Sequence, residues 1–563
     1  MTRSPSLIDK QVMWNRLVSI VEEQAQTLQR TAFSIIVRES GDLAAGVFDT
    51  RGRMLAQAVT GTPGHVNTMA LNVGHVIAAH PVETMKDGDV YITNDPWLGT
   101  GHTNDFCITT PVFRSGELVG LFACNAHLMD IGGVLGPSQS TDLYMEGLII
   151  PILKLVDGGA VNETLMAIIR SNTRLPVETE GDVYAMIACN DVGAAGLHAM
   201  MDEFGIGRLD ELADHIVDTS REAVLNNIRK LPQGTWRSEL TLDGYDEPVL
   251  LRAALTIAET GIHVDFTGTS PIVQQNINVP ICYTLAYTAF GIGCVVARGI
   301  PNNAGSLEPI TVSSPAGTIV NASKPAAVVA RHIVGLMMPD LVFGCLRQIL
   351  PDRVPAEGAG VLWGIIASGP RTSPPRADDQ YRVGIITTGG MGALPFRDGL
   401  SATGYPSGVR GGPVEIFESM STLVFWRKQY RTDSGGAGAF RGGLGQQIEI
   451  ENALDEPFVF YSSFERTKFA ARGGGGGHDG ALGVIRTSSG ERLAGKGTFS
   501  IDAGTRLHIE SPGGGGVGDP RRRSREAVAR DLAHGLISAD AARDVYGFDP
   551  EDPGCRTLTA TVR

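Results

Sequence analysis

Residues 105–127 read DFCITTPVFRSGELVGLFACNAH. Two apolar runs rich in β-branched and aromatic residues flank the polar segment 114–117, a pattern typical of a β-hairpin with a short turn. Antiparallel pairing about that turn places Asp105 opposite Ala126 or His127. Residues that face each other across such strands lie about 5 Å apart. The hairpin therefore predicts that Asp105 and His127 are neighbours at one end of a sheet.

The stretch immediately before the hairpin adds a second histidine. Residues 94–105 read NDPWLGTGHTND and are expected to form a glycine-containing loop that leads into the first strand. His102 can fold over the strand end where His127 arrives. Two imidazoles and a carboxylate that converge suit zinc, manganese or iron and leave positions open for water or substrate. We therefore predict a divalent-metal site at His102, Asp105 and His127. The alternative is that each histidine is a surface or hydrogen-bonded core residue.

Four further residues are candidates for the same site. Asp42 follows a glycine and is either a turn residue or a fourth ligand. Asp130 stands three residues after the second histidine and could be a ligand or an acceptor that orients an imidazole. His65 and Glu146 stand in glycine-marked segments that are expected to be loops. Each is a candidate substrate-binding or acid/base group, and a structural role is the alternative.

Composition excludes several classes of protein. The chain has 563 residues, which suggests roughly three or four folding units, and 42% of its residues are hydrophobic. Its net charge of −14 argues against nucleic-acid binding. The seven cysteines form no CxxC pair, and no apolar run approaches the roughly twenty residues of a membrane span. The N-terminal segment lacks the apolar core of a secretion signal. We therefore expect a cytoplasmic protein with neither a nucleic-acid nor a membrane partner.

Helical and strand patterns occupy separate blocks of the chain. Helical spacing is expected in 8–30, 163–171, 209–230, 283–298 and 326–350, with two short helices in 524–546. Strands are expected in 33–37, 44–48, 54–58, 235–268, 358–395 and 434–515. This arrangement favours the α+β class, a multi-domain chain with hairpin-rich mixed sheets and separate helical blocks. The expected regions are a metal-binding α+β region (1–155), a mainly helical region (156–235), a middle α+β region (236–355), a Gly-rich β region (356–520) and a C-terminal helical tail (521–563).

Glycine-rich segments invite a nucleotide-binding interpretation that the details oppose. Residues 490–497 nearly match a phosphate-binding loop, but Gly497 stands where a hydroxyl residue should hold magnesium. The following segment 498–501 reads as a strand, whereas the motif requires a helix. The runs 473–477 and 513–516 are better explained as tight turns, or as backbone close to a partner. We therefore expect no phosphate-binding loop here, and neither GxSxG nor HExxH occurs.

Short motifs follow one another along nearly the whole chain. In the first third they are Glu39-Ser-Gly-Asp42, Asn94-Asp-Pro, Gly101-His-Thr-Asn-Asp105, His127-Leu-Met-Asp-Ile-Gly-Gly133 and Glu146-Gly-Leu. Further along they are Asp265-Phe-Thr-Gly-Thr269, Pro355-Ala-Glu-Gly358, Asp433-Ser-Gly-Gly-Ala-Gly438, Arg441-Gly-Gly-Leu-Gly445 and Pro512-Gly-Gly-Gly-Gly516. Together these motifs resemble the hydantoinase B/oxoprolinase family.

This resemblance carries implications for partners and ligands. The family includes B subunits of ATP-dependent hydantoinases, 5-oxoprolinases and caprolactamase, and alpha subunits of acetone carboxylases. It implies a hydantoinase A-like partner that binds ATP with magnesium and phosphorylates the substrate carbonyl oxygen, in a hetero-oligomer of α2β2 type. The metal ligands of carboxylase members match His102, Asp105 and His127. An additional aspartate of lactamase members matches Asp42, which makes that residue a fourth expected ligand.

The resemblance leads us to expect the metal-bearing subunit of an ATP-dependent cyclic-amide hydrolase, acting on a hydantoin, 5-oxoproline or a lactam. Glu146, His65 and Asp130 remain alternative acid/base groups for the ring nitrogen. The alternatives are a subunit of an ATP-dependent ketone carboxylase and a non-catalytic scaffold subunit. Two departures from the family pattern, Ser40 for arginine and the missing Gly-Asn pair around 328–331, bear on the substrate and leave the metal residues unchanged.

Overall fold

A computed structural model describes residues 5–134, 136, 140–360, 362–376, 379–552 and 555. The chain divides into two compact units, Met1–Arg237 with Ala253–Pro339, and Ser238–Arg252 with Asp340–Arg563. Helices and antiparallel sheets occur in both, which confirms the α+β class. Within the described ranges, no helix combines the length and the apolar character that a membrane crossing requires. The five regions expected from the sequence stay a prediction.

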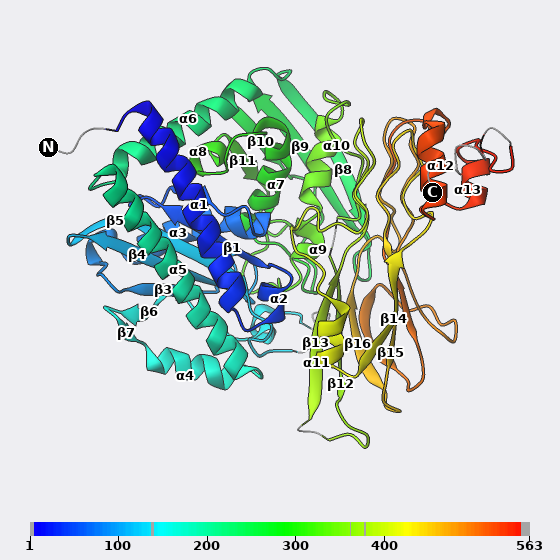
Figure 1. The fold of residues 1–563 in the computed structure, drawn as a ribbon, viewed down its shortest axis with the longest axis horizontal. Helices are drawn as coiled ribbons and strands as arrows, with labels where there is room; N and C mark the ends of the chain where they lie inside the picture. The colour runs from blue at the N-terminus through cyan, green and yellow to red at the C-terminus, as the bar shows by residue number, and fades with distance from the viewer. Residues whose placement is uncertain are drawn as a thin grey trace. The chain divides into compact units, whose positions relative to one another are not determined.

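A seven-stranded sheet forms the centre of the first unit (Figure 1). Its strands, in spatial order, are β2 (Met54–Gln57), β1 (Leu43–Phe48), β5 (Glu117–His127), β4 (Asp105–Arg114), β3 (Val90–Thr93), β6 (Leu153–Asp157) and β7 (Ala160–Val161). All neighbours are antiparallel. The register of β4 and β5 pairs Asp105 with His127, which confirms the predicted hairpin.

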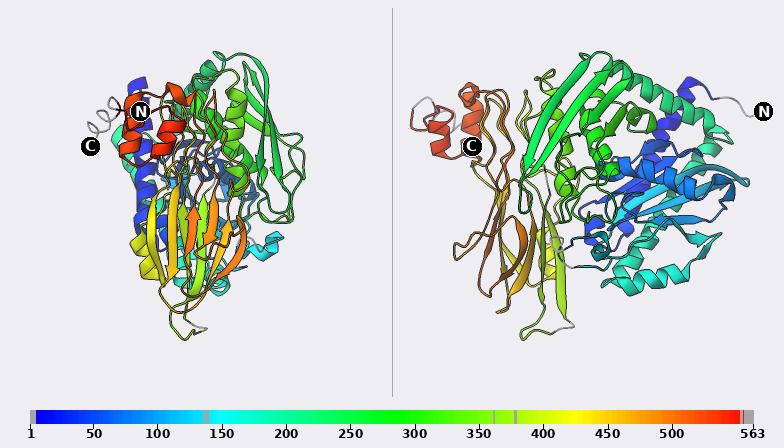
Figure 2. Two further views of the ribbon diagram at one scale, coloured as in Figure 1. Left: turned by 90° about the vertical axis from the view of Figure 1, so that its right-hand side faces the viewer. Right: turned by 180° about the vertical axis from the view of Figure 1, so that it is seen from behind.

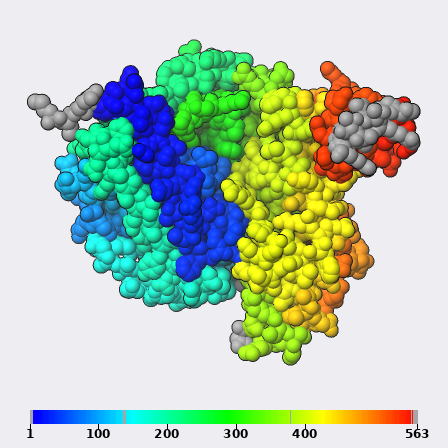
Figure 3. All heavy atoms as spheres, in the orientation of Figure 1, coloured from blue at the N-terminus to red at the C-terminus, as the bar shows by residue number. Residues whose placement is uncertain are grey.

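Helices cover both faces of this sheet. On one face lie α1 (Leu7–Thr31) and α5 (Pro176–Phe204), which pack side by side, and on the other lies α3 (Pro63–Ala79). All six residues of β1 are buried because both sides of the strand face a helix, so β1 lacks the alternation of a half-exposed strand. The outer side of α1 lies at the molecular surface (Figure 3).

The remaining helices of the first unit include α4 (Glu163–Asn172), α6 (Asp210–Ile228), α7 (Ile281–Val296), α8 (Ala304–Leu307) and α9 (His332–Gly335). A second sheet has the order β11 (Ile310–Ser313), β10 (Gly261–Asp265), β9 (Val249–Ala258) and β8 (Gly234–Leu242). The helices expected at 8–30, 163–171, 209–230 and 283–298 are confirmed. The 29-residue helix α5 lies within the stretch expected to be mainly helical.

Two predictions for this unit were wrong in part or in whole. The segment 33–37, expected as a strand, contains the short helix α2 (Ile35–Arg38). The backbone amides of Phe33 and Ser34 donate to Asp182 on α5, and this tertiary contact overrides the β preference of the apolar residues that follow. The expected helix 326–350 is helical only in α9 and in α10 (Met338–Leu346).

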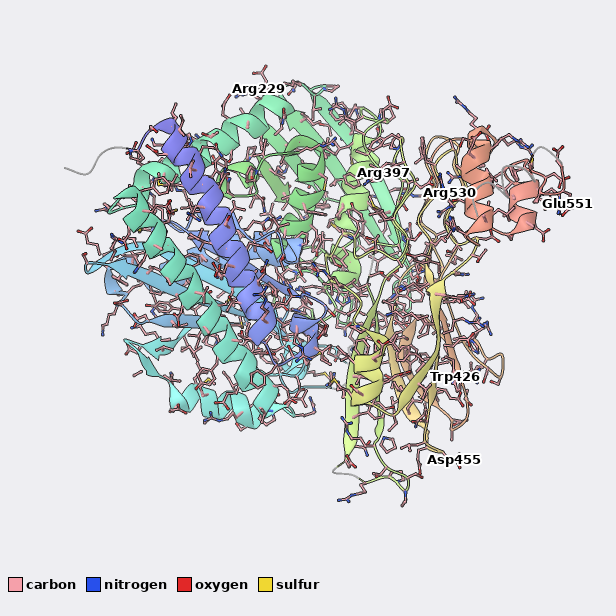
Figure 4. All side chains as sticks on the ribbon, viewed as in Figure 1. Arg229, Arg397, Trp426, Asp455, Arg530 and Glu551 are labelled. Carbon is pink, nitrogen blue, oxygen red and sulfur yellow. The ribbon has the colours of Figure 1, made fainter. Side chains whose placement is uncertain are left out.

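The second unit contains two four-stranded sheets (Figures 1 and 2). One has the order β13 (Gln380–Thr387), β12 (Trp363–Pro370), β16 (Phe458–Ser463) and β18 (Lys496–Ile501). The other has the order β14 (Leu423–Tyr430), β15 (Gln446–Asn452), β19 (Leu507–Glu510) and β17 (Val484–Thr487). Trp426 on β14 is exposed (Figure 4). The unit also contains the helices α11 (Val414–Met420), α12 (Arg525–Ala533) and α13 (Ala539–Asp544), and the Ser538 side chain caps α13 by accepting from the Ala541 amide.

The glycine run 513–516 passes through a layer made of backbone. The Gly514 amide donates to the Gly443 carbonyl at 3.0 Å, and the Gly436 amide donates to the Gly514 carbonyl at 2.8 Å. A Cβ on Gly514 would lie 2.2 Å from the Met391 carbonyl oxygen. Glycine is required here because main-chain segments approach closer than a methyl group allows.

The other glycine segments are structural as well. In the run 473–477, the Gly474 amide donates to the Gly516 carbonyl at 2.9 Å, so the two runs pack against each other. In the near match to a phosphate-binding loop, Lys496 begins strand β18 and forms a buried ion pair with Glu465 at 2.5 Å. A lysine held in this way is not presented to a phosphate, which agrees with rejecting that motif.

Candidate metal centre

Three adjacent strands bring their ends together at one edge of the central sheet. Asp105 begins β4 and His127 ends β5, and these two residues are partners in the ladder. Asp42 immediately precedes β1, and its carbonyl accepts from the His127 amide at 3.2 Å. The side chains of Asp42, His127 and Asp105 therefore belong to three neighbouring strands at the same end.

Two more histidines approach this edge from outside the sheet. His102 comes from the loop before β4, and its Nε2 lies 2.7 Å from Asp105 Oδ1. His65 comes from the first turn of α3, and its Nε2 lies 2.8 Å from Asp105 Oδ2. His127 Nδ1 lies 3.1 Å from Asp105 Oδ1 and 3.9 Å from Asp42 Oδ2. The four sequence-predicted ligand residues thus lie in one cluster around Asp105, and His65 joins them.

His102 has the arrangement expected of a metal-ligating imidazole. Its Nδ1 lies 3.0 Å from the Val329 carbonyl, so a proton on Nδ1 is donated there and the lone pair is left on Nε2. Nε2 is buried and makes no hydrogen bond to any described residue, although Asp105 Oδ1 is only 2.7 Å away. Burial, and next the Arg331 guanidinium, lower the pKa of His102 to about 4. A neutral imidazole beside a carboxylate fits a divalent cation.

The carboxylate of Asp105 contacts all three histidines of the cluster and is fully buried. Burial opposes its ionisation, but His102, His65 and Arg331 hold its pKa well below the ordinary value. Its two oxygens face different groups. Oδ1 faces His102 and His127, whereas Oδ2 faces His65, Arg331 and the hydroxyl of Thr100.

The placement of His65 in a loop was wrong. It lies in the first turn of α3, which Pro63 begins at a position where its missing amide costs nothing. Proline followed by a long apolar-periodic stretch is a helix-start signal, and it could have identified this element from the sequence. Burial opposes protonation of His65, but Asp105 and Asp42 raise its pKa above the ordinary value. Among the residues that the structure describes, His65, His102 and Asp105 form a group whose ligand atoms all lie within 4.8 Å of one another.

Two residues of the site have no counterpart among the sequence candidates. Arg331 is buried, and its Nη2 donates to Asp105 Oδ2 at 2.8 Å. His332 follows it at the start of α9, and burial together with Arg331 lowers its pKa to about 3. Arg331 precedes the short helix α9 and His332 begins it, in a segment that carries no metal-ligand spacing, so nothing local marks them as part of the site.

Glu146 and His102 both contact the backbone of Val329. Glu146 Oε1 accepts from the amides of Val328 and Val329 at 2.8 and 2.9 Å and from the hydroxyl of Ser140 at 3.0 Å. The Val329 carbonyl, in turn, faces His102 Nδ1. Oε2 is buried and makes no hydrogen bond within the described part of the chain. Burial raises the pKa of Glu146 to about 7, although the hydrogen bonds from those donors act to lower it.

Asp130 occupies a different setting. Its carboxylate accepts from the guanidinium and amide of Arg174 and from the hydroxyl of Thr173. These contacts hold the turn that leads into α5. The proposal that Asp130 orients an imidazole stays a prediction, and its observed partners point to a structural role.

Comparison with known proteins identifies relatives along almost the full length. A family model described as hydantoinase B/oxoprolinase matches residues 6–520. The caprolactamase subunit beta of Pseudomonas jessenii is 28% identical over 559 residues, which cover 95% of this chain and 95% of that protein. The 5-oxoprolinase 1 of Arabidopsis thaliana is 29% identical over 538 residues, covering 90% of this chain and 41% of that protein.

Solved structures also match this chain over nearly its whole length. The crystal structure of the ATP-dependent caprolactamase from Pseudomonas jessenii matches with a TM-score of 0.89 at 26% identity, over 99% of this chain and 100% of that chain. A nucleotide-free acetone carboxylase matches with a TM-score of 0.84 at 20% identity, over 99% of this chain and 83% of that chain, which shows a shared fold alone. The chain belongs to the hydantoinase B/oxoprolinase family.

Proposed function

We propose that this chain is the metal-bearing subunit of an ATP-dependent hydrolase of cyclic amides, with a hydantoin, 5-oxoproline or a lactam as substrate. The observation that carries the proposal is the convergence of four candidate ligands, three at the ends of neighbouring strands and His102 from the loop before β4. Among them, buried His102 directs a nitrogen without a hydrogen bond toward Asp105 Oδ1. The family membership supports the reaction class, because the caprolactamase relative is described as ATP-dependent.

In this proposal Asp42, His102, Asp105 and His127 hold a zinc, manganese or iron ion. Such an ion, when bound, lowers the pKa of water and polarises carbonyl and phosphoryl oxygens. The protein supplies the rest of the arrangement. The Val329 carbonyl fixes the tautomer of His102, and the partners of Asp105 Oδ2 hold that carboxylate in one orientation.

ATP is needed because an unstrained amide is a poor electrophile. Transfer of a phosphoryl group from ATP to the carbonyl oxygen activates the carbon, so that one water can add to it. The ring carbon–nitrogen bond then breaks, with a proton delivered to the nitrogen, and leaves an acyl phosphate. A second water releases phosphate from that carbon and gives the carboxylate. The proposed donor is ATP with magnesium on a hydantoinase A-like partner subunit, in a hetero-oligomer of α2β2 type. The relative named as a subunit beta supports an assembly with a second kind of chain.

Glu146 is the proposed proton donor to the ring nitrogen when the carbon–nitrogen bond breaks. With its pKa raised to about 7, it retains a proton near neutral pH. The other two candidates are less suited. Both ring nitrogens of His65 face carboxylates, and Asp130 is held by Arg174 and Thr173.

Co-expression with the A-like partner tests this function. We expect the purified complex to contain about one transition-metal ion per copy of this chain. It should also couple ATP hydrolysis to ring opening of one of three compounds: 5-oxoproline, hydantoin or caprolactam. Turnover only of ketones with bicarbonate would replace the hydrolase by a carboxylase. A metal-free, fully active complex would exclude the metal centre.

Glu146 also makes stability depend on pH. Its pKa is about 7 in the folded chain against 4.5 for a free glutamate, so the folded state binds the proton more tightly. The stabilisation is complete below about pH 4.5 and is lost as pH rises through about 7, an effect on the order of 3 kcal/mol. Asp142 contributes to the raised pKa, whereas the Val328 and Val329 amides and the Ser140 hydroxyl oppose it.

The substitution Glu146→Gln should flatten this dependence, because glutamine is neutral at every pH. Urea unfolding midpoints measured between pH 4.5 and 8 provide the check. The control is Glu163→Gln at an exposed position of α4, which should leave the wild-type slope intact. An unchanged slope in Glu146→Gln would show that Glu146 is not the titrating group.

A further inference from the structure

Arg331 is a buried cation in direct contact with Asp105, the central carboxylate of the proposed metal site. Its Nη2 donates to Asp105 Oδ2 at 2.8 Å, and its Nε donates to the Thr100 carbonyl at 2.7 Å. The guanidinium also stacks on the ring of Tyr283, 4.1 Å from the ring centre. A charge is costly to bury unless it is paired and hydrogen-bonded, and these contacts meet that requirement.

The surroundings are shaped around this guanidinium and its aromatic support. A Cβ on Gly101 would lie 2.8 Å from Arg331 Cδ, and Gly101 has a φ of +94°, which favours glycine. A Cβ on Gly335 would lie 2.3 Å from the Tyr283 ring, and one on Gly64 would lie 2.4 Å from the ring of Tyr287. Glycines therefore occupy the positions at which any side chain would displace the arginine or its support.

The contacts of Asp105 separate its two oxygens. Oδ2 receives Arg331, and Oδ1 lies 2.7 Å from His102 Nε2 and 3.1 Å from His127 Nδ1. We propose that Arg331 is a positioning residue for the metal centre. It holds Asp105 through Oδ2, so that Oδ1 is left for the ion, and it supplies a counter-charge that lets the site form before an ion binds. This inference rests on the proposed function.

The physical reason is that a fully buried carboxylate needs a cation close by. Removing one partner of a buried ion pair is strongly destabilising, because the other charge is left uncompensated. Arg331 compensates Asp105 permanently, whereas a bound ion would do so only when present. The two cations can therefore partly replace each other at Asp105. The stabilisation that an ion provides should grow when Arg331 is removed.

Thermal unfolding of the full chain tests this coupling. Wild type, Arg331→Met and Arg331→Lys are melted in EDTA and in excess Zn²⁺ or Mn²⁺. In EDTA, Arg331→Met should melt well below wild type. Added ion should raise its Tm by at least about 4 °C more than it raises the Tm of wild type. For Arg331→Lys we expect a Tm in EDTA, and an ion-induced rise in Tm, between those of wild type and Arg331→Met. Lysine keeps the positive charge but lacks the several N–H donors of the guanidinium.

The matched control is Arg53→Met in the same unit. Arg53 bridges Asp49 and Asp214 at 2.7 and 2.6 Å, away from the metal ligands, so its loss should lower Tm equally with and without ion. If the ion raises the Tm of wild type and of Arg331→Met equally, the inference about Arg331 is overturned, and the proposed metal centre is unaffected. If Arg331→Met does not fold, Arg331→Lys decides by the same comparison. A wild-type chain that binds neither ion in equilibrium dialysis would overturn the proposed metal centre and, with it, this inference.

Discussion

Asp105→Asn should abolish ion binding and lower turnover of the complex on the order of 10³-fold. The side chain keeps its shape but loses its charge, so the oxygen that faces His102 and His127 becomes a weak ligand. The substitution also leaves Arg331 buried without its anion, at a cost of about 3–5 kcal/mol. Metal content per chain and the steady-state rate of ATP-coupled ring opening measure the two effects.

The control for this substitution is Asp89→Asn. Asp89 is also a fully buried carboxylate of the first unit, and it pairs with Lys154 at 2.9 Å. It therefore reproduces the loss of an ion pair at a fully buried carboxylate but lies outside the candidate ligands. We expect Asp89→Asn to retain the metal while losing stability. Full metal content in Asp105→Asn would show that the ion, if present, is bound elsewhere.

Gly514→Ala should unfold the second unit. The added methyl would lie 2.2 Å from the Met391 carbonyl oxygen and 2.7 Å from the Gly392 amide nitrogen, and both are backbone atoms with no rotamer to change. Overpacking of a core typically costs about 1–3 kcal/mol, and a clash with main chain on this scale should exceed that range. Loss of soluble expression, or of a cooperative thermal transition for this unit, is the expected outcome.

Gly364→Ala is the matched control for this experiment. Gly364 lies on β12 in the same unit, and a Cβ there would meet nothing within 4 Å. Its substitution should leave the thermal transition close to wild type. If both variants melt alike, close backbone packing is not the reason for the glycine run.

The part of the candidate site that depends on residues close in sequence could be predicted. The hairpin 105–127 has a short turn, and turn length determines register, so Asp105 and His127 could be paired from the sequence. The proximity of His102 to this pair could be predicted because it precedes Asp105 by only three residues. Asp42 needed the family resemblance, because its strand pairs with β5 through a contact that the turn does not specify.

Arg331 and His65 show the limit of this reasoning. Arg331 contacts Asp105 across 226 positions of sequence, and it contacts His65 across 266. No periodicity or turn chemistry encodes such a separation. His65 is a candidate from the sequence alone, but Pro63 and Gly64 beside it mark the start of helix α3 and not the expected loop.

The sequence by itself determined the α+β class, the helices α1, α4, α6, α7, α12 and α13, many of the strands, and the pairing of Asp105 with His127. These follow from patterns whose range is a few residues: periodicity, caps and turn length. Tertiary structure alone decided three other features. They are the helix at 35–38, the backbone contacts that require glycine at 513–516, and the division of Asp105 between Arg331 and the ligand side. Each depends on which distant segment packs nearby, and burial in the folded chain is what gives those contacts their energy.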